Sequence, residues 1–230
     1  MTLNHFGLSL TLVVGMLAPG AHAQEAPVMR AGAVQTTEAM SVVQRNAQRV
    51  MEEVKNRRSE FESNPHALHD FVSDQMLELM DRDQATRLVL GVHARGASPS
   101  DIERFGTALA KNLAARYGKV LLEIDLNEPV MILGQSEMPR GRGVKVSTQV
   151  LRRNGKAVKV DYILSQTDGQ WRVFDVMVEG FSYAMTLKSA FNEDLRSQSI
   201  AQVTEQLEAR TRRSVGGKKE AGSSAGASRK

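Results

Sequence analysis

Few residues of this sequence could perform chemistry, and the strongest candidate is a carboxylate near the end of a predicted strand. Asp175 follows the only tryptophan, Trp171, in the stretch DGQWRVFDVMVEGFSYAM. In one of two possible strand registers Asp175 faces a cavity beside Tyr162, where the pair could transfer protons. The alternative is an aspartate that makes structural hydrogen bonds at a strand-to-helix corner. This alternative is favoured because no second catalytic partner is evident, so we predict no catalytic residue.

Metal-binding and nucleotide-binding signals are also weak. His66 and His69 have the helical spacing of metal ligands and precede Asp70, but no third ligand is evident. The chain has no cysteine, which excludes thiolate sites and disulfides. It contains no G-x-S-x-G, H-E-x-x-H or P-loop motif. We therefore predict no metal and no cofactor.

The two ends of the chain differ in composition from its body. An apolar run from Leu8 to Leu17 precedes the small-x-small triplet Ala21-His22-Ala23. This order predicts that residues 1–23 are a secretory signal peptide, and hence that the mature protein is exported to the periplasm. The Gly-, Ser- and Lys-rich residues 213–230 are predicted to be a disordered basic tail. Residues 24–212 remain as one domain, which is long enough for a single core.

The positive charge belongs to the tail. From Arg210 onward there are seven Lys or Arg residues and one Glu, while the whole chain has a formal net charge of +4. The body is therefore slightly acidic, which argues against a nucleic-acid partner. We expect the tail to solubilise the protein or to contact anionic membrane surfaces weakly. The protein itself is expected to be a monomer.

Helical periodicity dominates the first half of the chain. Apolar residues recur at helical spacing from Met40 to Val54, and two further start signals, Asn64-Pro65 and Ser98-Pro99, precede similar stripes. A short helix is predicted over residues 84–92. After Gly180, two more helices are predicted over residues 181–196 and 199–210.

The middle of the chain alternates apolar and polar residues with period two. Turn signals at Asn154-Gly155 and Asp168-Gly169 divide residues 142–178 into a three-stranded antiparallel meander, and a further strand is expected around residues 120–133. At the first turn, a three-residue loop with Gly155 in the left-handed conformation is preferred. It pairs Val146 with Tyr162 and Val150 with Val158, which puts both apolar rows on one face.

The register of the last strand stays open. A two-residue turn at Asp168-Gly169 directs Trp171, Val173 and Met177 to that face and sets Asp175 opposite Tyr162. A three-residue turn directs Phe174, Val176 and Val178 there instead. Both rows are apolar, which indicates a strand covered on both sides. The predicted fold class is α+β, with a curved antiparallel sheet of about four strands wrapped by N- and C-terminal helices and enclosing an apolar pocket.

The strand-to-helix corner also carries a family resemblance. The segment WRVFDVMVEGFSY resembles the tryptophan strand and Glu-Gly-x-Ser corner of the MlaC, or toluene-tolerance, family. KVDYIL and RLVLGVHARGASPSDIERFGTAL resemble its preceding strand and its Leu-Gly segment. Tyr183 and Lys188 stand where the family usually has leucine and arginine, and a lysine lacks the planar fork for bidentate phosphate contact.

The resemblance implies a periplasmic phospholipid-binding carrier without catalysis. Its implied partners are a phospholipid, an outer-membrane lipoprotein and an inner-membrane ABC transporter complex. A two-chain lipid has about 30 methylenes, each costing ~0.8 kcal/mol in water, so a carrier must enclose them. A small periplasmic enzyme using the same cavity with Asp175 and Tyr162 is the alternative. The residues expected to contact lipid are Leu109, Leu113, Tyr117, Val146, Val150, Val160, Tyr162, Leu164, Val173, Phe174 and Val176.

Overall fold

The helices of the first half begin where the sequence places its capping residues. The computed structural model describes residues 37–216, so the predicted signal peptide and residues 217–230 of the predicted tail lie outside the described residues. Thr37 and Ser98 accept hydrogen bonds from the third following backbone N–H, and Asn64 accepts two, from His66 and Ala67. The helices are α1 (Glu38–Asn56), α2 (Arg58–Ser63), α3 (Pro65–Leu79), α4 (Arg82–Leu90) and α5 (Pro99–Tyr117).

The strands follow in sequence order and form one antiparallel sheet. They are β1 (Met131–Glu137), β2 (Val144–Leu151), β3 (Ala157–Thr167), β4 (Gln170–Val178) and β5 (Phe181–Ser182), and the sheet order is β1-β2-β3-β4-β5. The C-terminal helices are α6 (Tyr183–Asn192), α7 (Asp194–Ser197) and α8 (Ile200–Gly216). The predicted α+β class is therefore confirmed, with a short fifth strand at one edge.

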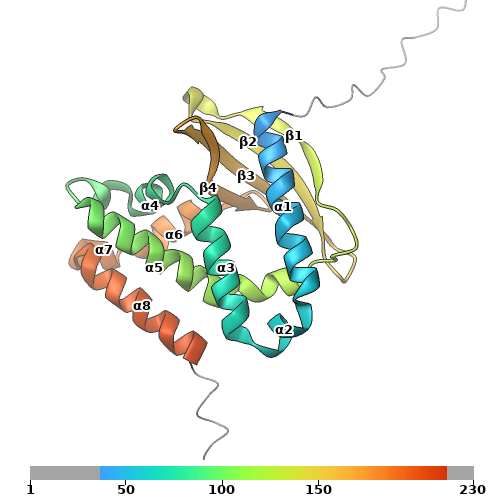
Figure 1. Cartoon of the computed structure of the whole chain (residues 1–230). Coiled ribbons are helices and arrows are strands. Elements are labelled where there is room, and N and C mark those ends of the chain that lie inside the picture. Colours follow the sequence, from blue (N-terminus) through green and yellow to red (C-terminus); the bar gives the residue numbers. More distant parts are fainter. Residues whose placement is uncertain (1–36, 217–230) are drawn as a thin grey trace, which may run out of the picture. The chain divides into compact units, whose positions relative to one another are not determined.

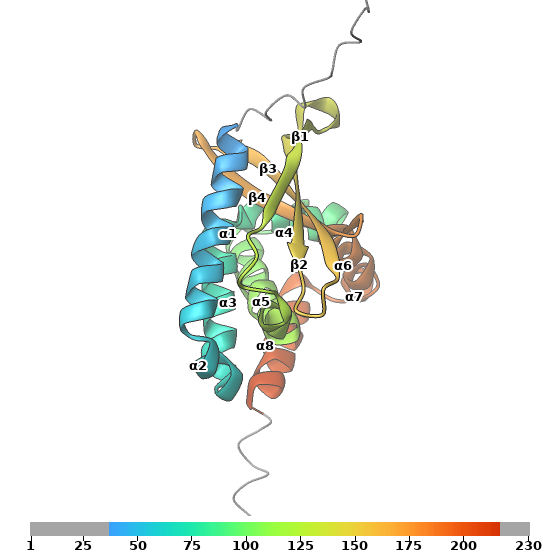
Figure 2. The same ribbon diagram turned by 90° about the vertical axis from the view of Figure 1, so that its right-hand side faces the viewer.

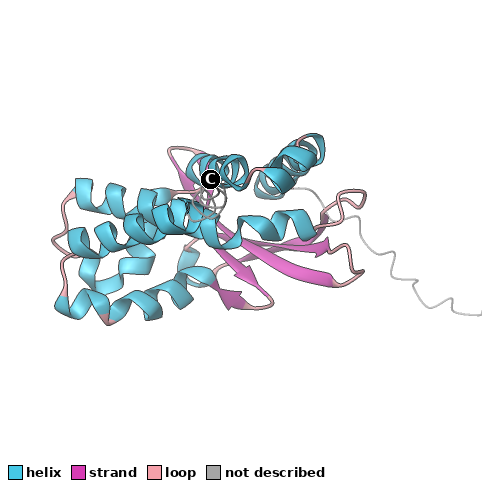
Figure 3. Ribbon diagram, turned by 90° about the horizontal axis from the view of Figure 1, so that it is seen from below, coloured by secondary structure: helices cyan, strands magenta, loops and turns pink. Residues whose placement is uncertain are grey.

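Helices from both halves of the chain pack against the sheet and against one another. The helix α1 lies along one face of the sheet, in contact with β1, β2 and β4 (Figures 1 and 2). The helix α5 contacts α3, α4 and α8, which joins the C-terminal helix to helices of the first half of the chain. Seen from below, helices and strands form distinct layers (Figure 3).

Four segments differ from the sequence-based prediction. The helix predicted over residues 181–196 begins only at Tyr183, after the short strand β5, and is interrupted at Glu193. Residues 118–123 form a 3-10 helix (Gly118–Glu123) instead of the expected strand, because Leu121 and Leu122 pack into a cluster with Phe61 and Phe71. The strand predicted around residues 120–133 therefore begins only at Met131. The helix α2 was not anticipated. The last helix extends beyond the predicted Arg210, as far as Gly216, because buried Thr211 accepts a hydrogen bond of 3.1 Å from Asn112 of α5.

The hairpin turns explain the register of the sheet. Arg152 and Lys156 close a three-residue loop in which Gly155 has a φ of 78°, and Val146 pairs with Tyr162 and Val150 with Val158. The preferred register of the first hairpin is thereby confirmed. The second hairpin has a two-residue turn in which Asp168 and Gly169 both have positive φ, as type I′ requires.

A β-bulge settles the open question about the last strand. Leu164 pairs with Val173 but Ile163 pairs with Asp175, so Phe174 is an extra residue in β4. The bulge shifts the side-chain alternation by one position. Trp171 and Val173 share the face of Tyr162 before the bulge, and Val176 and Val178 share it afterwards. Each of the two predicted registers therefore describes one half of the strand.

Candidate functional site: an apolar cavity between sheet and helices

A cavity of about 460 Å³ lies between the sheet and the helices, within the size range of small-molecule sites. The sheet contributes residues of β2, β3 and β4, and the opposite wall comes from α1, α3, α4 and α5. Nearly all of the lining side chains are aliphatic, aromatic or methionine. Apart from the tyrosines, the polar residues in the lining are Asn46, Gln75, Arg82, Thr86 and Asp175. Such a wall suits hydrocarbon better than a polar metabolite.

Eight of the residues predicted to contact lipid line this cavity, and three do not. The lining residues are Leu109, Leu113, Tyr117, Val150, Tyr162, Val173, Phe174 and Val176. Val146 and Leu164 are completely buried in a cluster with Ala39, Met40 and Val43 of α1. Val160 is half-buried and is also absent from the lining. The apolar face of the sheet is thus divided into two parts, of which only one borders the cavity.

Sequence reasoning missed the part of the wall that α1 and α3 contribute. Their lining residues include Val42, Val50 and Met51 of α1 and Val72, Met76 and Leu79 of α3. The helical stripes containing several of them were recognised, but a stripe predicts only that a face is covered. The face can be packed directly by side chains or can border a cavity. Which of the two occurs depends on the distance between the helix and the sheet. No feature of the sequence reports that distance.

Two tyrosines stand at the mouth of the cavity. The rings of Tyr117 at the end of α5 and Tyr183 at the start of α6 meet edge to face, with centroids 5.9 Å apart. Both line the cavity and both are exposed, as is Val120 beside them. Because a phenol has an apolar ring and a polar hydroxyl, it suits a boundary between hydrocarbon and water.

Tyr162 and Asp175 do not form the pair that proton transfer would use. Tyr162 stands opposite Val176, while Asp175 stands opposite Ile163, so their side chains point to opposite faces of the sheet. Burial raises the pKa of the Tyr162 hydroxyl above its usual value, so the phenol holds its proton more firmly than an exposed tyrosine does. The register that would set Asp175 opposite Tyr162 is therefore not adopted.

The carboxylate of Asp175 fastens the corner between β4 and α6. Its Oδ1 accepts hydrogen bonds from the backbone N–H of Val176, at 2.8 Å, and of Ala184, at 3.0 Å. Its Oδ2 accepts the hydroxyl of Ser182, at 2.5 Å, and Ser182 in turn caps α6 by accepting from the N–H of Met185. Asp175 borders the cavity, but both of its oxygens are occupied by structural hydrogen bonds.

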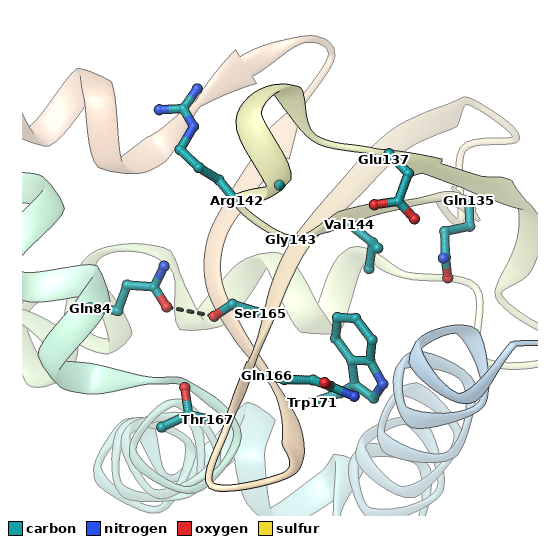
Figure 4. A pocket seen from close by; sticks show the side chains of 11 residues that line it. Gln84, Gln135, Glu137, Arg142, Gly143, Val144, Ser165, Gln166, Thr167 and Trp171 are labelled. Carbon is teal, nitrogen blue, oxygen red and sulfur yellow. Dashed lines mark hydrogen bonds between the residues drawn. The ribbon is translucent and has the colours of Figure 1, made fainter.

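A second depression, of about 550 Å³, lies at the other end of the sheet and is polar (Figure 4). It is lined by Gln84, Gln135, Glu137, Gly141, Arg142, Gly143, Val144, Ser165, Gln166, Thr167 and Trp171. Several of its polar groups already satisfy one another. Ser165 donates to Gln84 at 2.5 Å, and Thr167 donates to Asp81 at 2.6 Å. This depression therefore lacks the apolar surface that would hold hydrocarbon.

Comparison with known proteins identifies the family. A family model described as MlaC protein matches residues 44–209. The chain belongs to the MlaC family. It is 25% identical over 156 residues to toluene tolerance protein ttg2D of Pseudomonas putida, covering 67% of this chain and 72% of that protein. It is 20% identical over 153 residues to the intermembrane phospholipid transport system binding protein MlaC of Haemophilus influenzae, covering 65% of this chain and 71% of that protein.

A solved structure has the same fold. The phospholipid-binding protein from Ralstonia solanacearum, determined in complex with a phospholipid, superposes with a TM-score of 0.64 at 18% identity. The match covers 77% of this chain and 99% of that chain. The resemblance to the MlaC family that the corner motif indicated is thus confirmed, and so is the fold expected from it.

The structure gives a physical account of the corner motif in this MlaC family member. Glu179 and Gly180 both have positive φ and form the two-residue turn between β4 and β5. The Glu179 carboxylate accepts the backbone N–H of Lys159 at 2.9 Å, which ties the turn to β3. Together with Asp175 and Ser182, these residues hold the start of α6 at the cavity wall. The motif is therefore architectural in this chain.

Lys188, where the family resemblance led us to expect arginine, is not among the cavity residues. Its side chain packs over Gly91, where an added Cβ would lie 2.7 Å from Lys188 Cε.

No helix within residues 37–216 is long and apolar enough to cross a membrane. Within the same residues, no group of three or more His, Asp or Glu side chains is arranged to hold a metal ion.

Proposed function

We propose that this chain is a periplasmic carrier that binds a phospholipid with its acyl chains in the apolar cavity. The observation that carries this proposal is the cavity itself. Protein interiors are normally packed as densely as organic crystals, and unfilled apolar volume costs stability. A cavity of about 460 Å³ with an apolar wall is therefore costly unless an apolar ligand occupies it. The ligands named for two similar proteins, both phospholipids, support the same class of ligand.

The binding mode follows from where the polar groups lie. We infer that acyl chains lie between the sheet wall and the α1, α3 and α5 wall, in contact with Val150, Val176 and Leu113. The headgroup stays at the mouth, beside the tyrosine pair of Tyr117 and Tyr183. A phosphate there remains hydrated, whereas its burial among aliphatic side chains would carry a large desolvation cost.

The carrier role is proposed on energetic grounds. Each methylene exposed to water costs about 0.8 kcal/mol, so a lipid leaves a bilayer slowly unless a protein encloses its chains. We propose that the mature chain carries lipid between an outer-membrane lipoprotein and an inner-membrane ABC transporter complex. The predicted signal peptide 1–23 supports the periplasmic location, and the name of the Haemophilus influenzae relative supports a role in intermembrane transport.

The test is the lipid content of the mature chain after export in a Gram-negative host. Mass spectrometry of an organic extract is expected to find about one phospholipid per chain. Val176→Glu places a carboxylate against the acyl chains, and it is expected to abolish most of that lipid because a charge in hydrocarbon is strongly disfavoured.

Gln149→Glu is the matched control. Gln149 lies on the other face of the sheet and pairs with Lys159, so the same carboxylate is tolerated there and lipid content should not change. A wild-type chain that contains no lipid would overturn the proposal. Equal loss of lipid in both variants would overturn the assignment of the sheet wall.

A further inference from the structure

Exposed apolar side chains gather where the cavity opens. Phe181 is 75% exposed, and its strand β5 pairs it with Val178, a cavity residue. Two positions further on, Tyr183 contacts Tyr117, which is followed by exposed Val120. We call these four residues, Tyr117, Val120, Phe181 and Tyr183, the mouth collar. They come from α5, the 3-10 helix after it, β5 and α6, so two stretches of the chain that are distant in sequence contribute to one surface.

Exposure of a single apolar residue is ordinary, but this grouping is not. Tyr117, Val120 and Tyr183 line the cavity and reach solvent at once. Phe181 continues this apolar surface outward from the cavity. An apolar path therefore leads from the cavity interior to the exterior of the molecule.

Among the described residues, the charged side chains next to the collar that form no ion pair or hydrogen bond are positive. Arg116 and Lys119 are exposed on either side of Tyr117, and neither forms an ion pair with another residue of the described range 37–216. Glu179, the acidic residue near Phe181, is held by the backbone N–H of Lys159. Aromatic rings combined with lysine and arginine are typical of protein surfaces that bind the headgroup region of membranes.

We propose that the mouth collar docks directly on the surface of a phospholipid bilayer, with Phe181 inserted among the headgroups. This inference rests on the proposed function, because it gives the cavity a direct contact with the source of its lipid. A lipid that moves from a bilayer into a cavity pressed against it never exposes its full chain to water. Arg116 and Lys119 would then face lipid phosphates, so docking is stronger on anionic membranes.

The experiment is co-flotation of the purified mature chain with vesicles, without any other protein. Vesicles of equal parts phosphatidylcholine and phosphatidylglycerol are expected to carry the chain upward, and vesicles of phosphatidylcholine alone to carry less. Phe181→Glu should reduce the vesicle-bound fraction about tenfold, because it removes the inserted ring and adds repulsion. Phe181→Trp should keep binding and show a blue shift of tryptophan emission when vesicles are added.

Leu133→Glu is the control for placing a carboxylate at an exposed apolar position. Leu133 is also exposed, and it lies on β1, at the opposite edge of the sheet from β5. Its replacement should leave flotation unchanged. Equal flotation of Phe181→Glu and the wild type would overturn the proposal, and so would a wild-type chain that does not float with either vesicle. The latter result would assign the collar to a protein partner instead.

Lipid content separates the two proposals. A wild-type chain that carries phospholipid after export but does not bind vesicles overturns the docking inference and leaves the carrier function intact. A chain without lipid overturns the carrier function itself. Phe181→Glu leaves the cavity wall itself unchanged, because Phe181 is outside the residues that line the cavity.

Discussion

The two ends of one sheet face are built from the same kind of residue but reach opposite outcomes. At the closed end, Val146 and Leu164 pack without any exposed surface against Ala39, Met40 and Val43 of α1. At the open end, Val150 and Val176 face the cavity. Tyr162 and Val173 stand on the border, since both contact the closed cluster and both line the cavity.

The difference lies in what stands over each end. The first turns of α1 lie on the sheet at the closed end, in contact with β1 and β2. Further along α1, the same helical stripe supplies Ala47 and Val50 to the cavity wall instead. Valines on one sheet face therefore become core or cavity wall according to how closely the covering helix packs on them. Three substitution experiments and one titration test this division.

The largest expected effect is on stability at the closed end. Leu164→Ala removes a fully buried side chain from a packed cluster and should lower the free energy of unfolding by roughly 2–5 kcal/mol. Val176→Ala enlarges a wall that already faces open volume and should cost about 1 kcal/mol or less. Urea denaturation of the two variants measures the difference. Equal losses would mean that the open end is packed as tightly as the closed end.

Enlarging one α1 alanine over each end of the sheet face sharpens the comparison. Ala39→Leu overfills the closed cluster, where Ala39 is 1% exposed, and should cost about 1–3 kcal/mol. Ala47→Leu adds the same atoms to the cavity wall two helical turns later and should leave stability nearly unchanged. It should also reduce the amount of lipid retained, as measured by mass spectrometry. A stable Ala39→Leu variant would show that the closed end is not close-packed.

A change at Asp175 tests the corner that holds α6 at the open end. Asp175→Asn keeps an acceptor for the two backbone N–H groups but disturbs the hydrogen bond from Ser182, so a loss of about 1 kcal/mol is expected. Lipid content should be unchanged. Ser182→Ala removes the same partner and also the cap of α6, so its loss should be larger. A variant that folds normally but loses its lipid would give Asp175 a direct role in the cavity.

The smallest effect concerns the border residue Tyr162. Burial raises the pKa of its hydroxyl in the folded protein, whereas an unfolded tyrosine titrates near 10. The contribution of Tyr162 to the free energy of unfolding is therefore fully present below about pH 10. It is lost as the pH rises further, because the unfolded chain releases the phenol proton more readily than the folded chain does. Urea denaturation between about pH 9 and 11 should show a shallower decline for Tyr162→Phe than for the wild type. Tyr117→Phe, at an exposed position, serves as the control.

Much of this protein was determined by local sequence. Thr37, Asn64 and Ser98 fixed the starts of three helices, because a short polar side chain satisfies backbone N–H groups that no helix can satisfy itself. Gly155 and the Asp168-Gly169 pair fixed two hairpins, because only a few residues adopt positive φ at low cost. The tryptophan strand and its corner were also sufficient to indicate the family.

Only the tertiary structure decided which apolar residues form the cavity. The bulge at Phe174 depends on long-range pairing between β3 and β4, and it moves Val176 to the face of Tyr162. Leu121 and Leu122 lie in a 3-10 helix and not in a strand, because they pack against Phe61 and Phe71 of the helical layer. Val146 became core and Val150 became cavity wall, although both are valines on the same face of β2. Side-chain periodicity reports which face is covered, but the volume left beneath the cover is set by helix placement, which arises from contacts distant in sequence.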